Sequence, residues 1–160
     1  MTHSITTKGL YLAAAFAIAM TNFTNCSDKE AAGYIGQADI AVEDGKMTPE
    51  VMLSLGRLSD PQLSPDGKTI LYGVSYTSVP DNRSCRNLFL INADGTCRRQ
   101  LTREGSSISC ARWTDGGRGI MYIQKGQLRK ATVRGLGGNS PQLVKKTVIS
   151  DIPAGISEFK

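Results

Sequence analysis

The sequence contains a single histidine, His3, so the residue type that most often serves as a zinc ligand or catalytic base is missing from the rest of the 160 residues. Its four cysteines show no spacing typical of a metal site. Four aspartates stand in predicted turns or at strand edges, where such side chains bond local backbone amides: Asp60, Asp66, Asp94 and Asp115. We therefore expect no metal, no cofactor and no catalytic residue in this chain.

Clustered positive charge is also missing. Lys and Arg outnumber Asp and Glu by 19 to 14, but they gather only in adjacent pairs such as Arg98-Arg99 and Lys145-Lys146, and aromatic residues make up only 6%. A nucleic-acid-binding surface needs a basic stripe or patch. The charge of +5 instead indicates a slightly basic solvated surface, and we expect no nucleic-acid partner.

No apolar run is long enough to cross a membrane. The run from Leu10 to Met20 has 11 residues, whereas a membrane-spanning helix needs about 20. Preceded by Lys8, it fits the hydrophobic region of a secretory signal, so we expect residues 1–25 to be a signal peptide and the protein to be exported. Export permits disulfides, but three cysteines follow residue 26 and at least one of them stays unpaired within the chain: Cys85, Cys97 and Cys110.

Cys26 lies in the context Phe23-Thr-Asn-Cys, which resembles the lipobox of bacterial lipoproteins, although Phe23 and Asn25 stand where lipoproteins prefer a Leu-like and a small residue. Two outcomes stay open. A lipid on Cys26 would tether the protein to a membrane, as in an outer-membrane lipoprotein of a Gram-negative bacterium. Ordinary cleavage, for example after Ala19, would release a soluble periplasmic protein. In both cases residues 26–46 are expected to be a polar spacer.

The clearest positive feature is a sequence repeat. The segment 58–75 reappears as 108–125 at an offset of 50 residues, so that Tyr122 stands in the place of Tyr72. A period of roughly 40–50 residues built from short strands and turns is the mark of a β-propeller blade. One blade cannot bury its own faces, and blades are stable as a ring of several.

Alternation of apolar and polar residues predicts four strands in each copy. In blade 1 (about 58–102) they lie near 59–64, 69–76, 87–92 and 96–102, with a polar loop from 77 to 86. In blade 2 (about 108–148) they lie near 109–114, 119–124, 128–133 and 142–148. The pleat places side chains two residues apart on the same face, which separates Leu88 and Leu90 from Phe89 and Ile91.

A short helix is predicted at 47–57, with Thr48 as its N-cap and Gly56 just past its end. Its apolar stripe, Val51, Met52 and Leu55, is expected to pack on the first blade. At the other end, Ile156-Ser157 repeats Ile108-Ser109, so a third blade would begin at 156–160. We therefore predict an all-β fold, an incomplete β-propeller of about two four-stranded antiparallel blades plus the first strand of a third, and we expect the chain to be truncated.

The run Met47 to Lys68, with its Thr-Pro-Glu helix leading into Asp-Pro-Gln-Leu-Ser-Pro-Asp-Gly-Lys, resembles the start of the prolyl oligopeptidase family of serine peptidases. The similar branch is that of bacterial acylaminoacyl-peptidases and dipeptidyl-peptidases. This resemblance implies a closed propeller that filters peptide substrates, followed by a C-terminal α/β-hydrolase domain with a Ser-Asp-His triad and a Gly-x-Ser-x-Gly elbow. The chain has neither that elbow nor a histidine after His3, so it is expected to be a substrate-gating part that is not catalytic by itself.

A second class of protein stays open, because Ser-Pro-Asp-Gly also occurs in TolB-like propellers, which are periplasmic binding or scaffold proteins without enzymatic activity. Both alternatives predict the same blades. The sequence downstream discriminates them, since only a peptidase needs the serine elbow. Two blades alone would leave apolar faces and strand edges open, so residues 47–160 in isolation are expected to be poorly soluble or molten.

Overall fold

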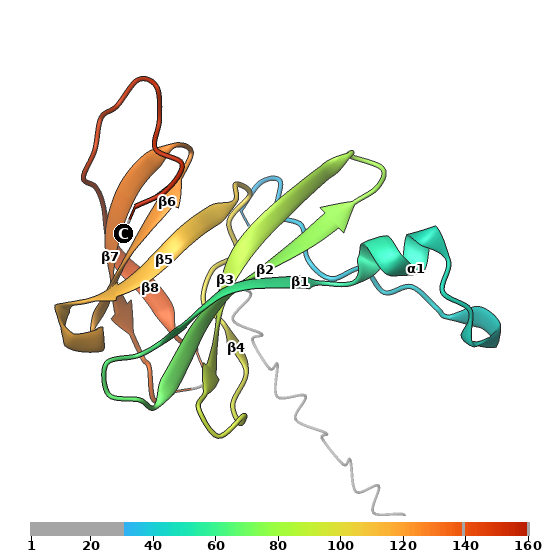
Figure 1. Ribbon diagram of the computed structural model, residues 1–160, viewed down its shortest axis with the longest axis horizontal. Helices are drawn as coiled ribbons and strands as arrows, with labels where there is room; N and C mark the ends of the chain where they lie inside the picture. Colours follow the sequence, from blue (N-terminus) through green and yellow to red (C-terminus); the bar gives the residue numbers. More distant parts are fainter. Residues whose placement is uncertain (1–30, 139, 160) are drawn as a thin grey trace, which may run out of the picture.

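The computed structural model describes residues 31–138 and 140–159 (Figure 1). The predicted signal peptide and Cys26 lie outside the described residues. In chain order the elements are η1 (Glu43–Gly45), α1 (Pro49–Ser54), β1 (Arg57–Leu63), β2 (Thr69–Ser78), β3 (Arg83–Asn92), β4 (Arg99–Gln100), β5 (Ile108–Thr114), η2 (Asp115–Gly117), β6 (Gly119–Gln124), β7 (Gln127–Arg134) and β8 (Gln142–Val148).

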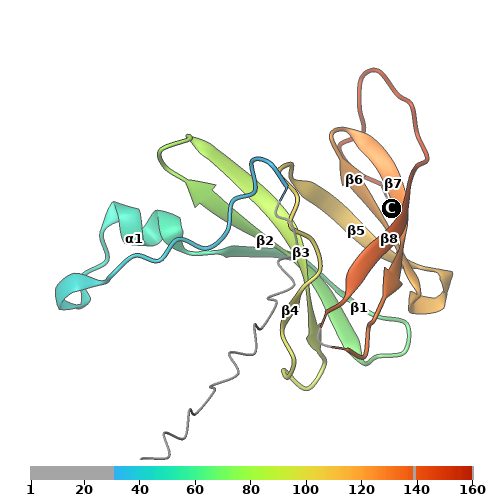
Figure 2. The same ribbon diagram turned by 180° about the vertical axis from the view of Figure 1, so that it is seen from behind.

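The strands form two antiparallel sheets of four strands each, in the orders β1-β2-β3-β4 and β5-β6-β7-β8. Each strand pairs with the one that follows it in the chain. The sheets lie next to one another, with α1 at the far end of the first sheet (Figures 1 and 2). The prediction of an all-β fold with two four-stranded antiparallel units is confirmed, and the two sheets in the described ranges do not close into a barrel.

The sequence repeat is also a repeat of backbone geometry. Leu63 pairs with Ile70 in the first sheet, and Trp113 pairs with Ile120 in the second. The pairing is interrupted by an irregularity between Ser59 and Gln62 and by another at the matching positions of β5. Asp60 and Cys110 adopt the left-handed conformation there, with φ of 51° and 49°. Extra residues in one strand of a pair bend it, so the first strand of each sheet bends at the same place.

The polar loop predicted from 77 to 86 is wrong. β2 and β3 continue through this region as one long hairpin that turns at residues 79–82, and Tyr76 pairs with Cys85. Polar Thr77 and Ser84 pair on an exposed face, where their hydroxyl oxygens lie 2.8 Å apart. Polar residues on the solvent face of a hairpin alternate with buried ones, so polarity alone did not indicate a loop.

Two other strand predictions need correction. The strand expected at 96–102 is reduced to Arg99–Gln100. At one end Thr96 belongs to the Asp94 turn. At the other end the pairing with β3 becomes irregular, because the Leu101 and Thr102 amides both donate to the Leu88 carbonyl and the Leu88 amide donates to the Thr102 hydroxyl. The strand expected at 156–160 is absent over residues 156–159. A strand needs a neighbouring backbone to pair with, and here Ile156 donates its amide to the turn carbonyl of Gly126 instead.

The main core lies between the two sheets and consists of residues from both: Leu71, Leu88, Leu90, Leu101, Ile108, Ala111, Ile120, Tyr122, Ala131 and Val133. A second cluster covers the other face of the first sheet, with Tyr72, Val74, Tyr76, Cys85 and Phe89. The predicted separation of Leu88 and Leu90 from Phe89 and Ile91 is confirmed, because the two pairs belong to different clusters.

The helix α1 begins as predicted, with the Thr48 hydroxyl accepting a bond from the Val51 amide. Its apolar stripe does not pack as expected, since Val51 is buried while Met52 and Leu55 are 52% and 53% exposed. The helix is only six residues long, and Val51 is its buried side chain. Within the described part of the chain, no helix combines the length and apolarity that crossing a membrane would require.

Candidate binding cleft between the two sheets

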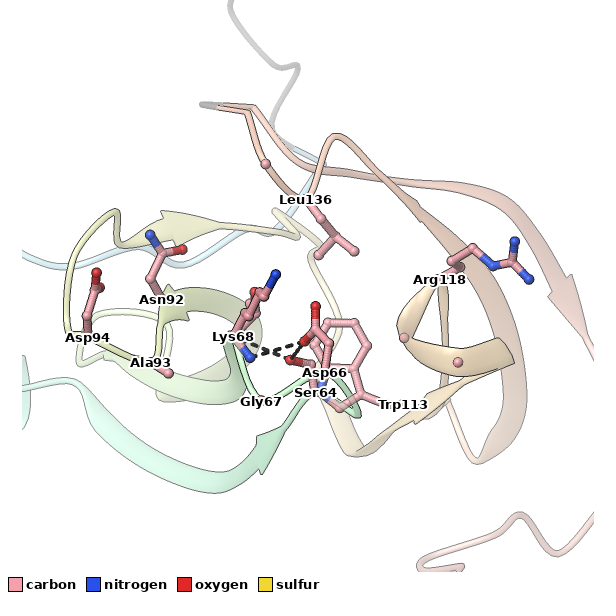
Figure 3. Close-up of a pocket in the computed structure, with 14 residues that line it drawn as sticks. Ser64, Asp66, Gly67, Lys68, Asn92, Ala93, Asp94, Trp113, Arg118 and Leu136 are labelled. Carbon is pink, nitrogen blue, oxygen red and sulfur yellow. Dashed lines mark hydrogen bonds between the residues drawn. The ribbon is translucent and has the colours of Figure 1, made fainter.

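A cleft of about 660 Å³ opens where the turns of both sheets come together. It is bordered by the β1–β2 turn, the β3–β4 turn, η2 and the β7–β8 loop (Figure 3). Antiparallel hairpins place alternate turns at the same end of a sheet, and the repeat gives both sheets the same layout. The cleft therefore follows from the fold and needs no special insertion in the sequence.

The β1–β2 turn is held by its own polar groups. Ser64 donates its hydroxyl to Asp66 at 2.5 Å, and the same carboxylate accepts the Lys68 amide at 3.1 Å. Gly67 has a φ of 72°, a conformation that glycine adopts without strain. These hydrogen bonds, led by the one from Ser64, lower the pKa of Asp66. Its charge thus stabilises the turn that borders the cleft.

The other turn aspartates behave alike. Asp94 accepts the amide and the hydroxyl of Thr96 at 2.9 and 2.6 Å, and the Thr96 side chain is the main cause of the lowered pKa of Asp94. Asp115 accepts a bond from Lys130 at 2.9 Å, which likewise lowers its pKa. As predicted for turn positions, these carboxylates bind neighbouring groups of the protein.

Trp113, which occupies the repeat position of Leu63, is the aromatic residue that lines the cleft. Its indole nitrogen donates to the carbonyl of Gln62 at 3.2 Å, which fixes the ring of β5 against β1. In Figure 3 Leu136 points toward this ring, Lys68 stands beside it, and Arg118 extends away. Such a surface can receive the apolar side chain of a peptide, with Lys68 available to attract a carboxylate.

Asp60 differs from the other three aspartates, because it lies within a strand and not in a turn. It lies in the irregularity of β1, where both of its carboxylate oxygens accept from one Arg112 nitrogen at 2.9 and 2.8 Å. This ion pair joins the first strands of the two sheets. Sequence reasoning missed it, although a signal existed: the repeat partners are Cys110 for Asp60 and Gln62 for Arg112, so the two copies differ at both positions.

Residue types common in catalytic and metal-binding sites are scarce in the described part of the chain. Residues 31–138 and 140–159 contain no histidine and no group of three or more side chains able to hold a metal ion. The cysteines in these ranges, Cys85, Cys97 and Cys110, are free thiols. Cys85 is the most buried of them, and burial raises the pKa of its thiol, whereas a nucleophilic cysteine needs a lowered pKa.

Comparison with known proteins places this chain beside two dipeptidyl-peptidases. It is 31% identical over 119 residues to dipeptidyl-peptidase 5 of Porphyromonas endodontalis, which covers 73% of this chain and 16% of the relative. It is 38% identical over 98 residues to dipeptidyl-peptidase 5 of Porphyromonas gingivalis, covering 58% of this chain and 14% of that protein. No protein-family model matches the chain. The chain is thus similar to peptidases, but it spans only about a sixth of their length.

Proposed function

We propose that this chain is an N-terminal propeller part of an exported dipeptidyl-peptidase-like serine peptidase, which gates the entry of peptides and holds no catalytic group itself. The observation that carries the proposal is a coincidence of two findings. Most of the chain is similar in sequence to two dipeptidyl-peptidases. The chain also contains two four-stranded sheets whose first two strands pair in the same register and whose first strands bend at the same place. This is the pattern expected of successive blades.

The gating role is supported by the place of the ion pair and the cleft. β1 and β5 are the edge strands of their sheets and lie side by side, joined by Asp60–Arg112 and by the bond from Trp113 to Gln62. In a propeller the first strands of the blades surround the central channel. Charged and aromatic groups on these strands would then be the ones that a passing peptide meets.

Export through residues 1–25 and a lipid tether at Cys26 belong to the same proposal. Both features are inferred from the sequence. Expression in a Gram-negative host followed by intact-mass measurement tests them together. A mass that begins at Cys26 and includes a diacylglycerol would support the tether, and a Cys26→Ser variant should lose that added mass. A cleaved N-terminus upstream of Cys26 without lipid would support the soluble alternative.

The decisive experiment concerns the sequence that follows codon 160 in the source DNA. The peptidase proposal predicts a continuous reading frame that encodes a Gly-x-Ser-x-Gly elbow and then the Asp and His of a triad. The longer protein should release dipeptides from a fluorogenic substrate and lose this activity when the elbow serine is changed to alanine. The 160-residue chain should show none. A frame that ends after a last repeat, with no elbow, would favour a TolB-like binding or scaffold protein.

A further inference from the structure

Residues 31–36, which were expected to belong to a polar spacer, pack against the outer face of the first sheet. Ile35 is only 8% exposed and inserts among Tyr72, Val74 and Phe89. We call residues 31–36 the strap and the surface beneath it the strap-binding face. The strap-binding face consists of Tyr72, Val74, Tyr76, Cys85 and Phe89.

The repeat shows what kind of surface the strap covers. Tyr72 of the strap-binding face stands in the place of Tyr122. Tyr122 lies on the face of the second sheet that packs against the first sheet, in the main core. The strap-binding face is therefore the counterpart of a face that, in the second sheet, receives a whole neighbouring sheet. In the first sheet it receives the strap instead.

The strap turns at residues 32–33, where the Tyr34 amide donates to the Ala31 carbonyl at 2.9 Å, and further hydrogen bonds tie it to the first sheet and to the loop after β4. The Ala31 amide donates to the Arg103 carbonyl at 3.2 Å. Arg83 donates to the carbonyls of Gly33 and Gly105, and the Tyr34 hydroxyl accepts from the Gln100 amide at 2.9 Å.

Beyond Ile35 the chain no longer packs tightly. A hollow of about 340 Å³ lies between residues 34–40 and the turn of the β2–β3 hairpin. One large side chain and a few hydrogen bonds thus anchor the strap, which is the profile of a segment that opens locally before the rest of the structure unfolds.

We propose that the strap occupies the strap-binding face as a displaceable substitute for a neighbouring sheet, the one occupant that the matching face of the second sheet receives. The strap keeps Tyr72, Val74 and Phe89 out of water when no sheet lies against them. A sheet that packs there, as a closed ring would require, must first displace it. This inference does not depend on whether a catalytic domain follows.

Gly105 offers a selective way to release the strap. A Cβ atom at this position would lie 1.9 Å from the carbonyl oxygen of Ala32, so Gly105→Ala forces the two backbones apart. Gly105 does not have a positive φ, so the clash with Ala32 and not a left-handed backbone is what alanine meets there. Gly137→Ala is the matched control, because Gly137 does not have a positive φ either and a Cβ there meets nothing within 4 Å.

The readout is the reactivity of Cys85, which is 1% exposed in the cluster that Ile35 completes. In the full chain with Cys26, Cys97 and Cys110 changed to serine, Cys85 is the sole remaining thiol. A disulfide reagent should label it about tenfold faster or more in Gly105→Ala than in the parent chain, since about 1.4 kcal/mol less is then needed for opening. Gly137→Ala should label at the parental rate.

The single tryptophan of the chain separates release of the strap from unfolding. Trp113 lies in the cleft, bonded to Gln62, and packs against the main core, whereas the strap packs against the other face of the first sheet. Faster labelling of Cys85 with unchanged Trp113 emission supports a displaceable strap. An unchanged labelling rate overturns the proposal, and so does faster labelling accompanied by the red-shifted emission of an unfolded chain, because the strap would then be an integral part of the fold.

A peptide added in trans tests the strap-binding face itself. Ile35→Ser removes the anchor of the strap and should also expose Cys85. A synthetic peptide of residues 31–40 should restore protection in a concentration-dependent manner, while the same peptide with serine in place of Ile35 should not. Equal protection by both peptides, or by neither, would show that the face does not recognise the strap sequence.

Discussion

The two sheets are built from matching sequences, yet they turn opposite faces toward the main core between them. In the first sheet Leu71 points into the main core, whereas Ile70 on the other face is only partly buried. In the second sheet Ile120, the counterpart of Ile70, is 0% exposed in the main core. A sheet exposes both faces, and in a stack each face meets a different neighbour. Burial in a repeat protein therefore follows from position in the stack as well as from the pattern of the strand.

The flanking segments make the second difference between the sheets. The strap covers the outer face of the first sheet and contributes Ile35 to its cluster. At the second sheet, the residues after β8 make local contacts instead, such as the bonds from Ile156 to Gly126 and from Cys110 to the carbonyl of Ser157. Each sheet is thus completed by chain outside the repeat, but only the first acquires a buried anchor side chain at 8% exposure.

The largest expected effect comes from removing the strap altogether. A chain of residues 47–160 exposes the apolar face around Tyr72 and Phe89, and exposed faces of this kind favour association. We expect it to elute as aggregates in size-exclusion chromatography or to show a molten state without a sharp thermal transition. A chain of residues 31–160 should be more soluble under the same conditions. Equal behaviour of the two chains would show that the strap does not protect the outer face of the first sheet.

Matched isoleucines provide the next largest effect. Ile120→Ala leaves a cavity between the sheets and should lower the free energy of unfolding by about 2–5 kcal/mol. Ile70→Ala, the same change at the same repeat position, should cost about half as much or less, since its side chain is already in partial contact with water. Urea denaturation of both variants measures the difference. A larger loss for Ile70→Ala would mean that the outer face carries more of the stability than the main core.

A smaller effect is expected for the ion pair between the sheets. A double-mutant cycle with Asp60→Ala and Arg112→Ala should give a coupling energy of about 1 kcal/mol, because both side chains are about a third exposed or less and the geometry is good. The pair Asp115–Lys130 lies within the second sheet and is 46% and 44% exposed. Its coupling should be clearly smaller than that of Asp60–Arg112, because water screens exposed charges. Equal couplings would indicate that the contact between sheets adds nothing to the pair.

The smallest expected effect is a dependence of stability on pH, which arises from one buried titratable group in each sheet. Burial raises the pKa of Cys85 in the first sheet from its ordinary value of 9.0, and that of Tyr122 in the second from 10.0. Both groups lose their protons first in the unfolded state, so stability falls as the pH rises from about 9. Cys85→Ala should flatten the start of this decline and Tyr122→Phe its later part. Thermal melting across this range measures the effect, and a decline unchanged in both variants would contradict it.

Much of each sheet was predictable because it depends on neighbours in the chain. The Pro65-Asp66-Gly67 turn is set by local hydrogen bonds and by the freedom of Gly67, and it forms as expected. The alternation at Leu88 and Phe89 follows from the pleat of a strand and was also predicted. The extent of the β2–β3 hairpin was not, since its polar residues face solvent and resemble those of a loop.

The candidate site was less predictable. Its turns could be located in the sequence, but the cleft arises only when turns of two different sheets meet. The Asp60–Arg112 pair spans 52 residues, and the pattern around Asp60 indicated a turn. The anchor Ile35 lies 37 residues before Tyr72 in a stretch whose composition suggested a spacer. Interactions of this range depend on how the elements pack, which no local pattern encodes.

The sequence by itself determined that the chain contains two matching units of short antiparallel strands, where their turns lie, and which residues share a face. These features follow from steric and hydrogen-bonding preferences that act over a few residues. Only the tertiary structure decided which face of each sheet is buried between them, that the strap covers the remaining face of the first, and that Trp113 and Lys68 border one cleft. The free energy of burial depends on which surfaces lose contact with water, and that depends on the neighbour that each face meets.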